Sequence, residues 1–198
     1  MLTLFLLFIL AAPASDSSSP INVVRAFYDQ IIKLHPIGIP TGEAKRALWP
    51  LLSSRLAHRL DALQACEDDY YRRNKKKLES EQLKPSIGWI ESGLFSGENE
   101  QALPAEVTIT RLEPAGTGRF KAYLQFTYRG HIRDVRPPDD SNTFRWSGIV
   151  LVVSEGNRYA VDDYIPIDLD SGKPLAALSQ GFPERSGNRW VGLKGQGY

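Results

Sequence analysis

Two adjacent carboxylates, Asp162 and Asp163, stand at the end of a predicted β-hairpin. The stretch Phe144–Ile165 predicts a strand, a tight Gly-Asn turn and a returning strand that ends in this acidic pair. Strand alternation would turn only one of them, Asp163, to the concave face that it would share with Val161. A carboxyl in a dry pocket has a raised pKa and can act as a general base. The alternative is structural, with both carboxylates accepting from loop amides or pairing with an arginine.

A second candidate set consists of aromatic side chains that carry a polar group. Such groups can line a pocket and orient a ligand, although the same residues often lie in a core with the polar tip bonded at its edge. The set comprises Tyr28, Trp89, Tyr128, Trp146 and Tyr164. The predicted ligand-binding residues are Tyr28, Trp89, Tyr128, Trp146 and Asp163. In an enzyme, Asp163 would be the base and Tyr28 or Tyr128 the oxyanion donor.

Metal and cofactor chemistry has no recognisable motif in this chain. His35, His58 and His131 lack the spacing of metal ligands, and a single cysteine cannot complete a site. The sequence contains no nucleophile elbow, P-loop or dinucleotide fingerprint. Cys66 falls on the apolar face of a predicted helix, so we expect a small buried hydrophobic residue rather than a nucleophile. We therefore expect no metal and no cofactor.

The overall charge limits the classes of partner. The chain has 198 residues, with 24 Lys and Arg against 23 Asp and Glu, and a net charge of +1. A protein that grips a phosphate backbone needs a surplus of positive charge, so we do not expect nucleic acid as a partner. The length suits one domain with a substantial core. A small ligand or a protein partner is expected, and a homodimer is left open.

The N-terminus predicts export. Leu2–Ala12 is almost wholly apolar but too short for a transmembrane helix, which needs about 20 residues. An A-x-A site, Ala12-Pro13-Ala14, and a polar stretch follow it, which is typical of a secretory signal peptide over residues 1–14. The start lacks Lys and Arg, and a buried N-terminal helix or strand is the alternative. We expect a periplasmic or secreted protein, with no membrane attachment after cleavage and no internal disulfide.

Helices precede strands along the chain. Ser19-Pro20 opens a first helix, which ends before His35. A second helical region begins near Thr41 and is interrupted at Pro50. It restarts after Ser53 and runs to about Asn74. Their apolar stripes are Val24, Phe27, Ile31 and Leu34, then Leu56, Leu60, Leu63, Cys66 and Tyr70. Period-two patterns predict strands over Glu106–Leu112, Lys121–Tyr128, Phe144–Val153 and Arg158–Tyr164.

Three other segments have distinct compositions. Lys75–Lys84 is highly charged, which indicates a solvated helix end and loop or else a contact site for an acidic partner. Pro85–Leu103 is irregular but apolar enough that we expect it to fold back over a hydrophobic opening. Residues 168–198 are rich in Gly, Ser and Pro and are expected to be a C-terminal extension with one short helix over Pro174–Leu178.

This order of elements predicts an α+β fold in which a curved antiparallel sheet of about four strands wraps around the N-terminal helices. Three motifs carry a resemblance to a known superfamily: Pro20-x-x-Val23-Val24-x-x-Phe27-Tyr28, Leu52-Ser53-x-Arg55-Leu56, and Trp146-x-x-Ile149-x-x-Val152-x-x-Glu155-Gly156-x-x-Tyr159-x-Val161-Asp162-Asp163. Over roughly residues 20–167 the chain resembles the nuclear transport factor 2-like superfamily, in particular its small exported bacterial members of unassigned function. The resemblance implies a cone-like half-barrel with helices inside its curve and a pocket at the wide end.

The resemblance does not decide the function, because the superfamily includes isomerases, dehydratases, binding proteins, secretion-system components and immunity proteins. The lack of a dense polar constellation favours a non-catalytic, exported binding or interaction protein that uses the pocket or its rim. An immunity-type or secretion-associated protein is one variant. The rival is a small isomerase- or dehydratase-like enzyme, which requires Asp163 and a tyrosine hydroxyl to face one open cavity.

Overall fold

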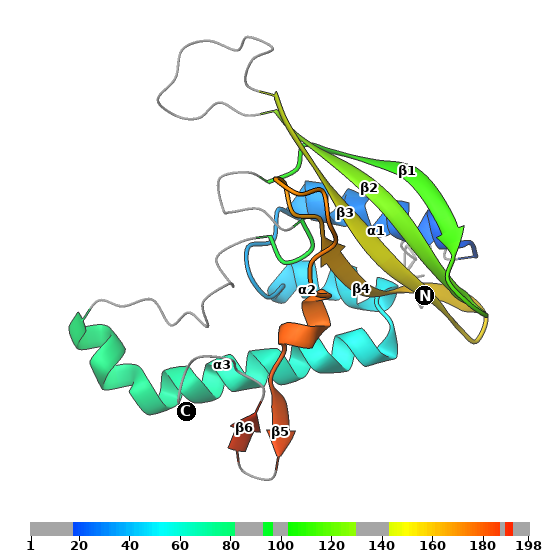
Figure 1. The fold of residues 1–198 in the computed structure, drawn as a ribbon. Coiled ribbons are helices and arrows are strands. Elements are labelled where there is room, and N and C mark those ends of the chain that lie inside the picture. The colour runs from blue at the N-terminus through cyan, green and yellow to red at the C-terminus, as the bar shows by residue number, and fades with distance from the viewer. Residues whose placement is uncertain (1–17, 82–92, 97–102, 130–142, 187–188, 192–198) are drawn as a thin grey trace, which may run out of the picture.

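The computed structural model describes residues 18–81, 93–96, 103–129, 143–186 and 189–191, and Figure 1 shows their arrangement. The helical elements are α1 (Pro20–Leu34), α2 (Gly42–Leu48), the 3-10 turn η1 (Trp49–Leu51), α3 (Ser54–Glu81) and the 3-10 turn η3 (Leu178–Gly181). The strands are β1 (Glu106–Pro114), β2 (Arg119–Arg129), β3 (Thr143–Glu155), β4 (Arg158–Pro166), β5 (Glu184–Ser186) and β6 (Arg189–Val191). The predicted leader, residues 1–14, and Trp89 lie outside the described residues.

The predicted α+β fold class is confirmed. Strands β1 to β4 form one antiparallel sheet in chain order, and a separate two-stranded sheet joins β5 to β6. The β2–β3 pairing is the longest, from Arg119 opposite Val153 to Arg129 opposite Thr143. Gly156 turns the chain from β3 to β4 with a φ of 60°, a conformation that glycine adopts without steric cost. The sheet curves over the helices on one face and is not closed (Figure 1).

Helix α1 forms the centre of the core because it contacts all four strands of the main sheet. Its start is capped as the sequence predicts, with the Ser19 hydroxyl accepting from the Asn22 amide at 3.2 Å and Pro20 in the first turn. It ends at His35, whose φ of 45° is a left-handed cap. The largest fully buried side chains include Tyr164, Phe27, Phe95, Phe126, Leu48, Leu52, Leu56, Leu60 and Leu63.

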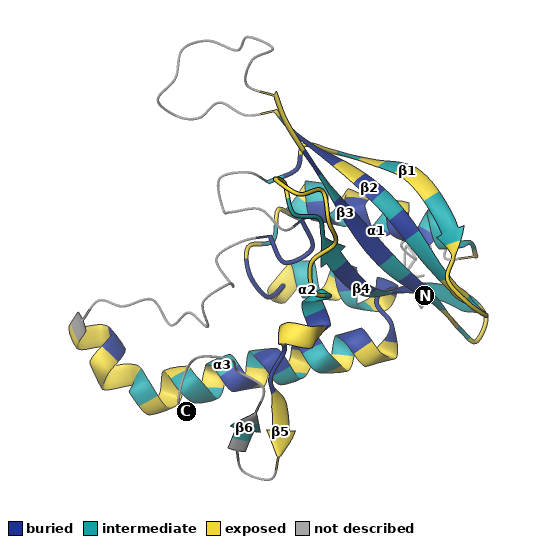
Figure 2. Ribbon diagram, in the orientation of Figure 1, coloured by how far each residue is buried: buried dark blue, intermediate teal, exposed yellow. Residues whose placement is uncertain are grey.

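Helix α3 is longer than the sequence pattern predicts. It runs through the charged stretch to Glu81, where we expected it to end near Asn74. Lysine, leucine and glutamate are good helix formers, and Lys75 and Glu79 lie one turn apart as an ion pair at 3.9 Å. At 1.5 Å per residue its 28 residues span about 42 Å. Figure 2 shows that exposed positions dominate its second half, which extends past the body of the molecule.

The segment after residue 167 packs against the domain. Phe182 is only 2% exposed and joins the main hydrophobic core. The short helix expected over Pro174–Leu178 is not formed there. Instead Pro174 forms an isolated antiparallel β-bridge with Ile167, which holds this proline against the end of β4. A 3-10 turn begins only at Leu178.

Candidate functional site

The acidic pair lies at a β-bulge in β4. Asp163 is opposite Leu151 and Val161 is opposite Val152, so Asp162 is an extra residue without a partner position on β3. Val161 and Tyr164 both lie in the core. In a regular strand one residue separates two neighbours on the same face, but here two residues, Asp162 and Asp163, separate them. The prediction that only one aspartate faces inward is therefore wrong. The bulge turns both carboxylates away from the core residues on either side of them.

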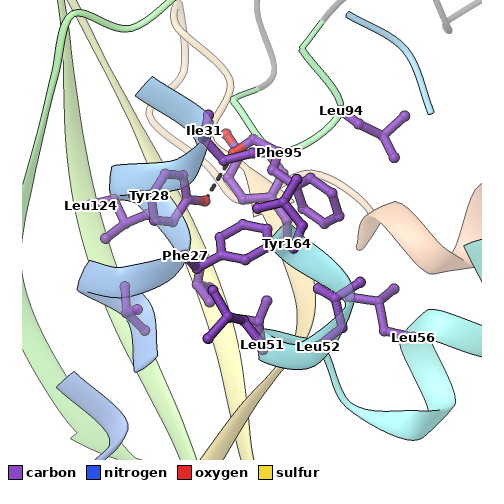
Figure 3. Packing of buried hydrophobic residues seen from close by; sticks show 14 of the residues in the cluster. Phe27, Tyr28, Ile31, Leu51, Leu52, Leu56, Leu94, Phe95, Leu124 and Tyr164 are labelled. Carbon is purple, nitrogen blue, oxygen red and sulfur yellow. Dashed lines mark hydrogen bonds between the residues drawn. The ribbon is translucent and has the colours of Figure 1, made fainter. Parts of the chain in front are cut away.

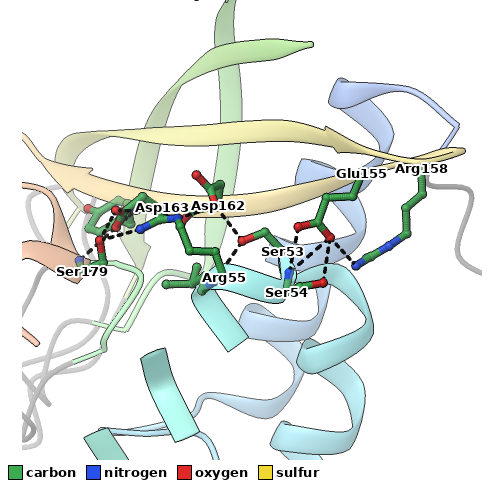
Figure 4. Close-up of polar contacts among 10 residues, drawn as sticks. Ser53, Ser54, Arg55, Glu155, Arg158, Asp162, Asp163 and Ser179 are labelled. Atoms are coloured by element: carbon green, nitrogen blue, oxygen red, sulfur yellow. Dashed lines mark hydrogen bonds and ion pairs between the residues drawn. The ribbon is translucent and has the colours of Figure 1, made fainter. Parts of the chain in front are cut away.

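Both carboxylates meet Arg55, in the first turn of α3 (Figure 4). The Arg55 guanidinium donates from Nε to Asp162 Oδ1 at 2.9 Å and from Nη2 to Asp163 Oδ2 at 3.3 Å. Nη2 also donates to the Asp162 carbonyl at 2.6 Å. The hydrogen bond with Asp162 is the largest cause of a raised pKa for Arg55, so this guanidinium stays charged. These contacts join the first turn of α3 to β4.

Asp163 is 3% exposed, and its carboxylate is surrounded by donors. It accepts from the amide and the hydroxyl of Ser179 at 3.0 and 2.5 Å, and from the Tyr164 amide at 2.9 Å. With Arg55 these contacts engage both carboxylate oxygens. A general base must be within reach of a substrate proton, and this carboxylate is enclosed by the chain itself. Asp163 therefore holds β4, η3 and α3 together.

The N-terminus of α3 is fixed to the β3–β4 hairpin by the same kind of contact. The Ser53 amide donates to the Val161 carbonyl at 2.7 Å, and the Ser53 hydroxyl donates to Asp162 at 2.6 Å. The Glu155 carboxylate accepts from the Ser54 amide at 2.9 Å (Figure 4). Acidic groups are favourable at the positive end of a helix, so these bonds stabilise the start of α3.

Two of the aromatic candidates, Tyr28 and Trp146, lie in a second cluster, where both pack on Phe126. The Tyr28 hydroxyl donates to the Phe95 carbonyl at 2.9 Å (Figure 3), and the Trp146 indole donates to the Ser96 carbonyl at 2.6 Å. Burial is the largest cause of a pKa for Tyr28 well above the usual tyrosine value, so the hydroxyl remains a proton donor. Both donors are thus satisfied by the backbone of the short segment Gly93–Ser96.

Leu94 and Phe95 of this segment are part of the hydrophobic core. Phe95 is 1% exposed, and its ring lies edge-on to Phe27 with 4.9 Å between centroids. Phe126 stacks on Trp146 at 5.2 Å. A cavity beside Gly93–Ser96 has a volume of about 10 Å³, room for about one water, whereas ligand pockets measure about 300–1,000 Å³. For these four residues the prediction that the loop folds back over a hydrophobic opening is confirmed.

The structure brings some of the predicted site residues together and separates others. Tyr28 and Trp146 both pack on Phe126, while Tyr128 is partly exposed and packs against the edge of the core. The contacts of the Asp163 carboxylate are with Arg55, Tyr164 and Ser179, so it belongs to the other cluster. Sequence reasoning missed Ser179 because it is 16 residues from Asp163 in a segment without periodicity.

Other site types find no support in the described part of the chain. No group of three or more His, Cys, Asp or Glu residues there is placed to hold a metal ion. No helix within the described ranges is long and apolar enough to span a membrane. Comparison with models of known protein families and with curated proteins found no match to this chain.

Proposed function

We propose that this protein is an exported, non-catalytic interaction protein that binds a protein partner through its outer surface. The observation that carries the proposal is the filled interior, by which we mean the packing of the described residues beneath the sheet. The polar groups of Tyr28 and Trp146 are bonded to the backbone of Gly93–Ser96, and Phe95 is buried in the core with its ring edge-on to Phe27 of α1. Binding at the rim of this structure requires no rearrangement of the core.

A small ligand under the sheet would first have to displace Gly93–Ser96. Exposing Phe95 costs about 1.5–3 kcal/mol, and the two hydrogen bonds contribute about 0.5–1.5 kcal/mol each. The total of about 2.5–6 kcal/mol would weaken the apparent affinity of such a ligand by a factor of about 10²–10⁴. This penalty favours partner binding at the surface over ligand binding in the interior.

The isomerase- or dehydratase-like alternative has no observation in its favour. It requires Asp163 and a tyrosine hydroxyl to face one open cavity, but Asp163 is bonded to Arg55 and Ser179, and the Tyr28 hydroxyl is bonded to Phe95. An immunity-type or secretion-associated role remains one form of the proposal, supported by the resemblance to the nuclear transport factor 2-like superfamily.

Export rests on the N-terminal sequence. The apolar run Leu2–Ala12 and the site Ala12-Pro13-Ala14 support cleavage after Ala14. We expect intact-mass measurement of the protein from its source cells to give a mature chain that begins at Ser15. A chain that retains Leu2–Ala12 would contradict export by this route.

Native mass spectrometry of the protein, purified without denaturant from its source cells, tests the proposed function. We expect complexes that contain a second polypeptide and no small molecule retained in stoichiometric amount. A retained molecule of a few hundred daltons that is lost on unfolding would place binding in the interior and contradict the proposal.

A further inference from the structure

The second half of α3 projects away from the core. The buried stripe of this helix, which includes Leu56, Leu60 and Leu63, reaches Cys66. Beyond it, residues 71–80, here called the distal segment, are mostly exposed, with Leu78 the buried exception (Figure 2). A helix that is polar around most of its circumference gains little from the core, so its sequence is free to serve a contact.

The distal segment carries a concentrated positive charge. Its cations are Arg72, Arg73, Lys75, Lys76 and Lys77, and its only carboxylate is Glu79. The whole chain has a net charge of +1, so the distal segment at +4 leaves the remainder at −3. Five of the 24 Lys and Arg residues therefore lie within ten residues, and this segment has a local excess of positive charge.

Contacts among the described residues neutralise only part of this charge. Arg72 and Arg73 both pair with Asp69, at 2.6 and 2.5 Å, and the Trp190 indole donates to Asp69 at 3.2 Å. Lys76 and Lys77 form no ion pair with any side chain that the structure describes. Asp69 thus ties the base of the distal segment to β6, Lys75 pairs with Glu79, and no described side chain neutralises Lys76 or Lys77.

We propose that the distal segment docks onto an acidic surface of a protein partner. This inference rests on the proposed function and names the surface and the chemistry that it would use. Tyr71 is 40% exposed beside Arg72, and tyrosine and arginine are enriched at protein interfaces. Charge complementarity with a carboxylate-rich surface would also accelerate association.

Two other anionic partners fit less well. A helix that lies on a membrane needs an exposed apolar face, whereas Tyr71 is the one exposed large hydrophobic residue among the described positions of α3. A nucleic acid would be repelled by carboxylates on the same helix such as Asp68 and Glu79. A protein surface can match both signs of charge.

The experiment uses a carbodiimide, which joins lysine amines to carboxylates in direct contact, on the full-length protein in an extract of its source cells. We expect mass spectrometry to find Lys75, Lys76 or Lys77 joined to an Asp or Glu of a second protein. The variant K75R/K76R/K77R keeps the charge and should lose these cross-links, while its affinity for the purified partner stays within twofold.

Charge reversal then measures the contribution of the distal segment. We expect K76E/K77E to weaken partner binding at least about tenfold, equal to about 1.4 kcal/mol. The matched control Lys33→Glu with Arg119→Glu changes the net charge equally at exposed positions on α1 and β2, and should alter the affinity less than twofold.

Each other outcome overturns the inference. Cross-links elsewhere, with an affinity that K76E/K77E leaves unchanged, would assign binding to another surface and leave the proposed function standing. No cross-link from the distal segment at all would also count against it. Tighter binding to phosphatidylglycerol vesicles or a 20-base-pair duplex than to any protein would make the partner class wrong. A retained small ligand and no protein partner would remove the proposed function itself.

Discussion

Replacing Asp163 by asparagine tests whether the acidic pair is structural. The substitution keeps the size of the side chain but converts one acceptor oxygen to a donor and removes the charge. The oxygen that accepts from the Arg55 guanidinium at 3.3 Å would become an amide that faces it donor to donor, while Ser179 can reorient its hydroxyl. A hydrogen bond with a charged partner contributes about 1.5–3 kcal/mol, so we expect the free energy of unfolding to fall by about 2 kcal/mol.

Urea unfolding followed by tryptophan fluorescence measures this change, provided that the dependence on urea concentration keeps the same slope. Asp61→Asn is the control, because it breaks an exposed ion pair with Lys45 and should cost less than about 0.5 kcal/mol. The reasoning would be refuted if Asp163→Asn were as stable as the wild type. It would be refuted most clearly if that variant instead lost a catalytic turnover.

Three further predictions concern the core and α3. Gly148→Ala should destabilise the fold by about 1–3 kcal/mol in the same unfolding assay, because its Cβ would lie 2.5 Å from the buried Tyr164 ring, and a neutral result would contradict this packing. Burial and Asp68 raise the pKa of Glu67 to about 7, so its charged form is disfavoured in the folded state. The free energy of unfolding should therefore fall as the pH rises from about 4.5 to 7. Glu67→Gln should stabilise the protein by about 1–2 kcal/mol at pH 8 but hardly at pH 4, and equal effects at both pH values would refute the raised pKa. Burial also raises the pKa of Cys66 to about 11, so a thiol reagent at pH 8 should react only after unfolding, and rapid labelling of the native protein would disprove the burial.

The fold class was predictable because the helical and the strand periodicity are both clear in the sequence. Val24, Phe27 and Ile31 recur at helical spacing on α1, and Ala122, Leu124 and Phe126 alternate on β2. The Ser19 cap was equally predictable, since its hydroxyl accepts from the Asn22 amide within the first turn of the same helix. Such local signals depend on neighbours in sequence, which is why they can be read without a structure.

The arrangement of the acidic pair was not predictable, because its causes lie far apart in the chain. The bulge at Asp162 breaks the alternation, and nothing in the hairpin sequence marks it. Arg55 and Ser179, which meet Asp163, are separated from each other by 124 residues. The end of α3 was misplaced for a different reason: charge indicates exposure, and an exposed lysine run forms a helix as readily as a loop.

Likewise, the apolar content of the loop before β1 predicted that it folds back, but not which backbone groups it presents. The carbonyls of Phe95 and Ser96 take the Tyr28 and Trp146 donors, and this follows from the path of the backbone rather than from residue type. Of the aromatic candidates, Tyr28 and Trp146 lie together, both packed on Phe126. Their polar atoms are bonded within the protein, which a sequence pattern does not reveal.

The filled interior separates surface binding from pocket binding most directly, and xenon tests it. Xenon enters apolar cavities that are larger than a water molecule and empty of side chains. Spectra of the ¹⁵N-labelled protein under increasing xenon pressure should show no saturable shift of the Phe95 and Ser96 amides or of the Trp146 indole. Saturable shifts at these positions would reveal a cavity beneath the sheet and contradict the account.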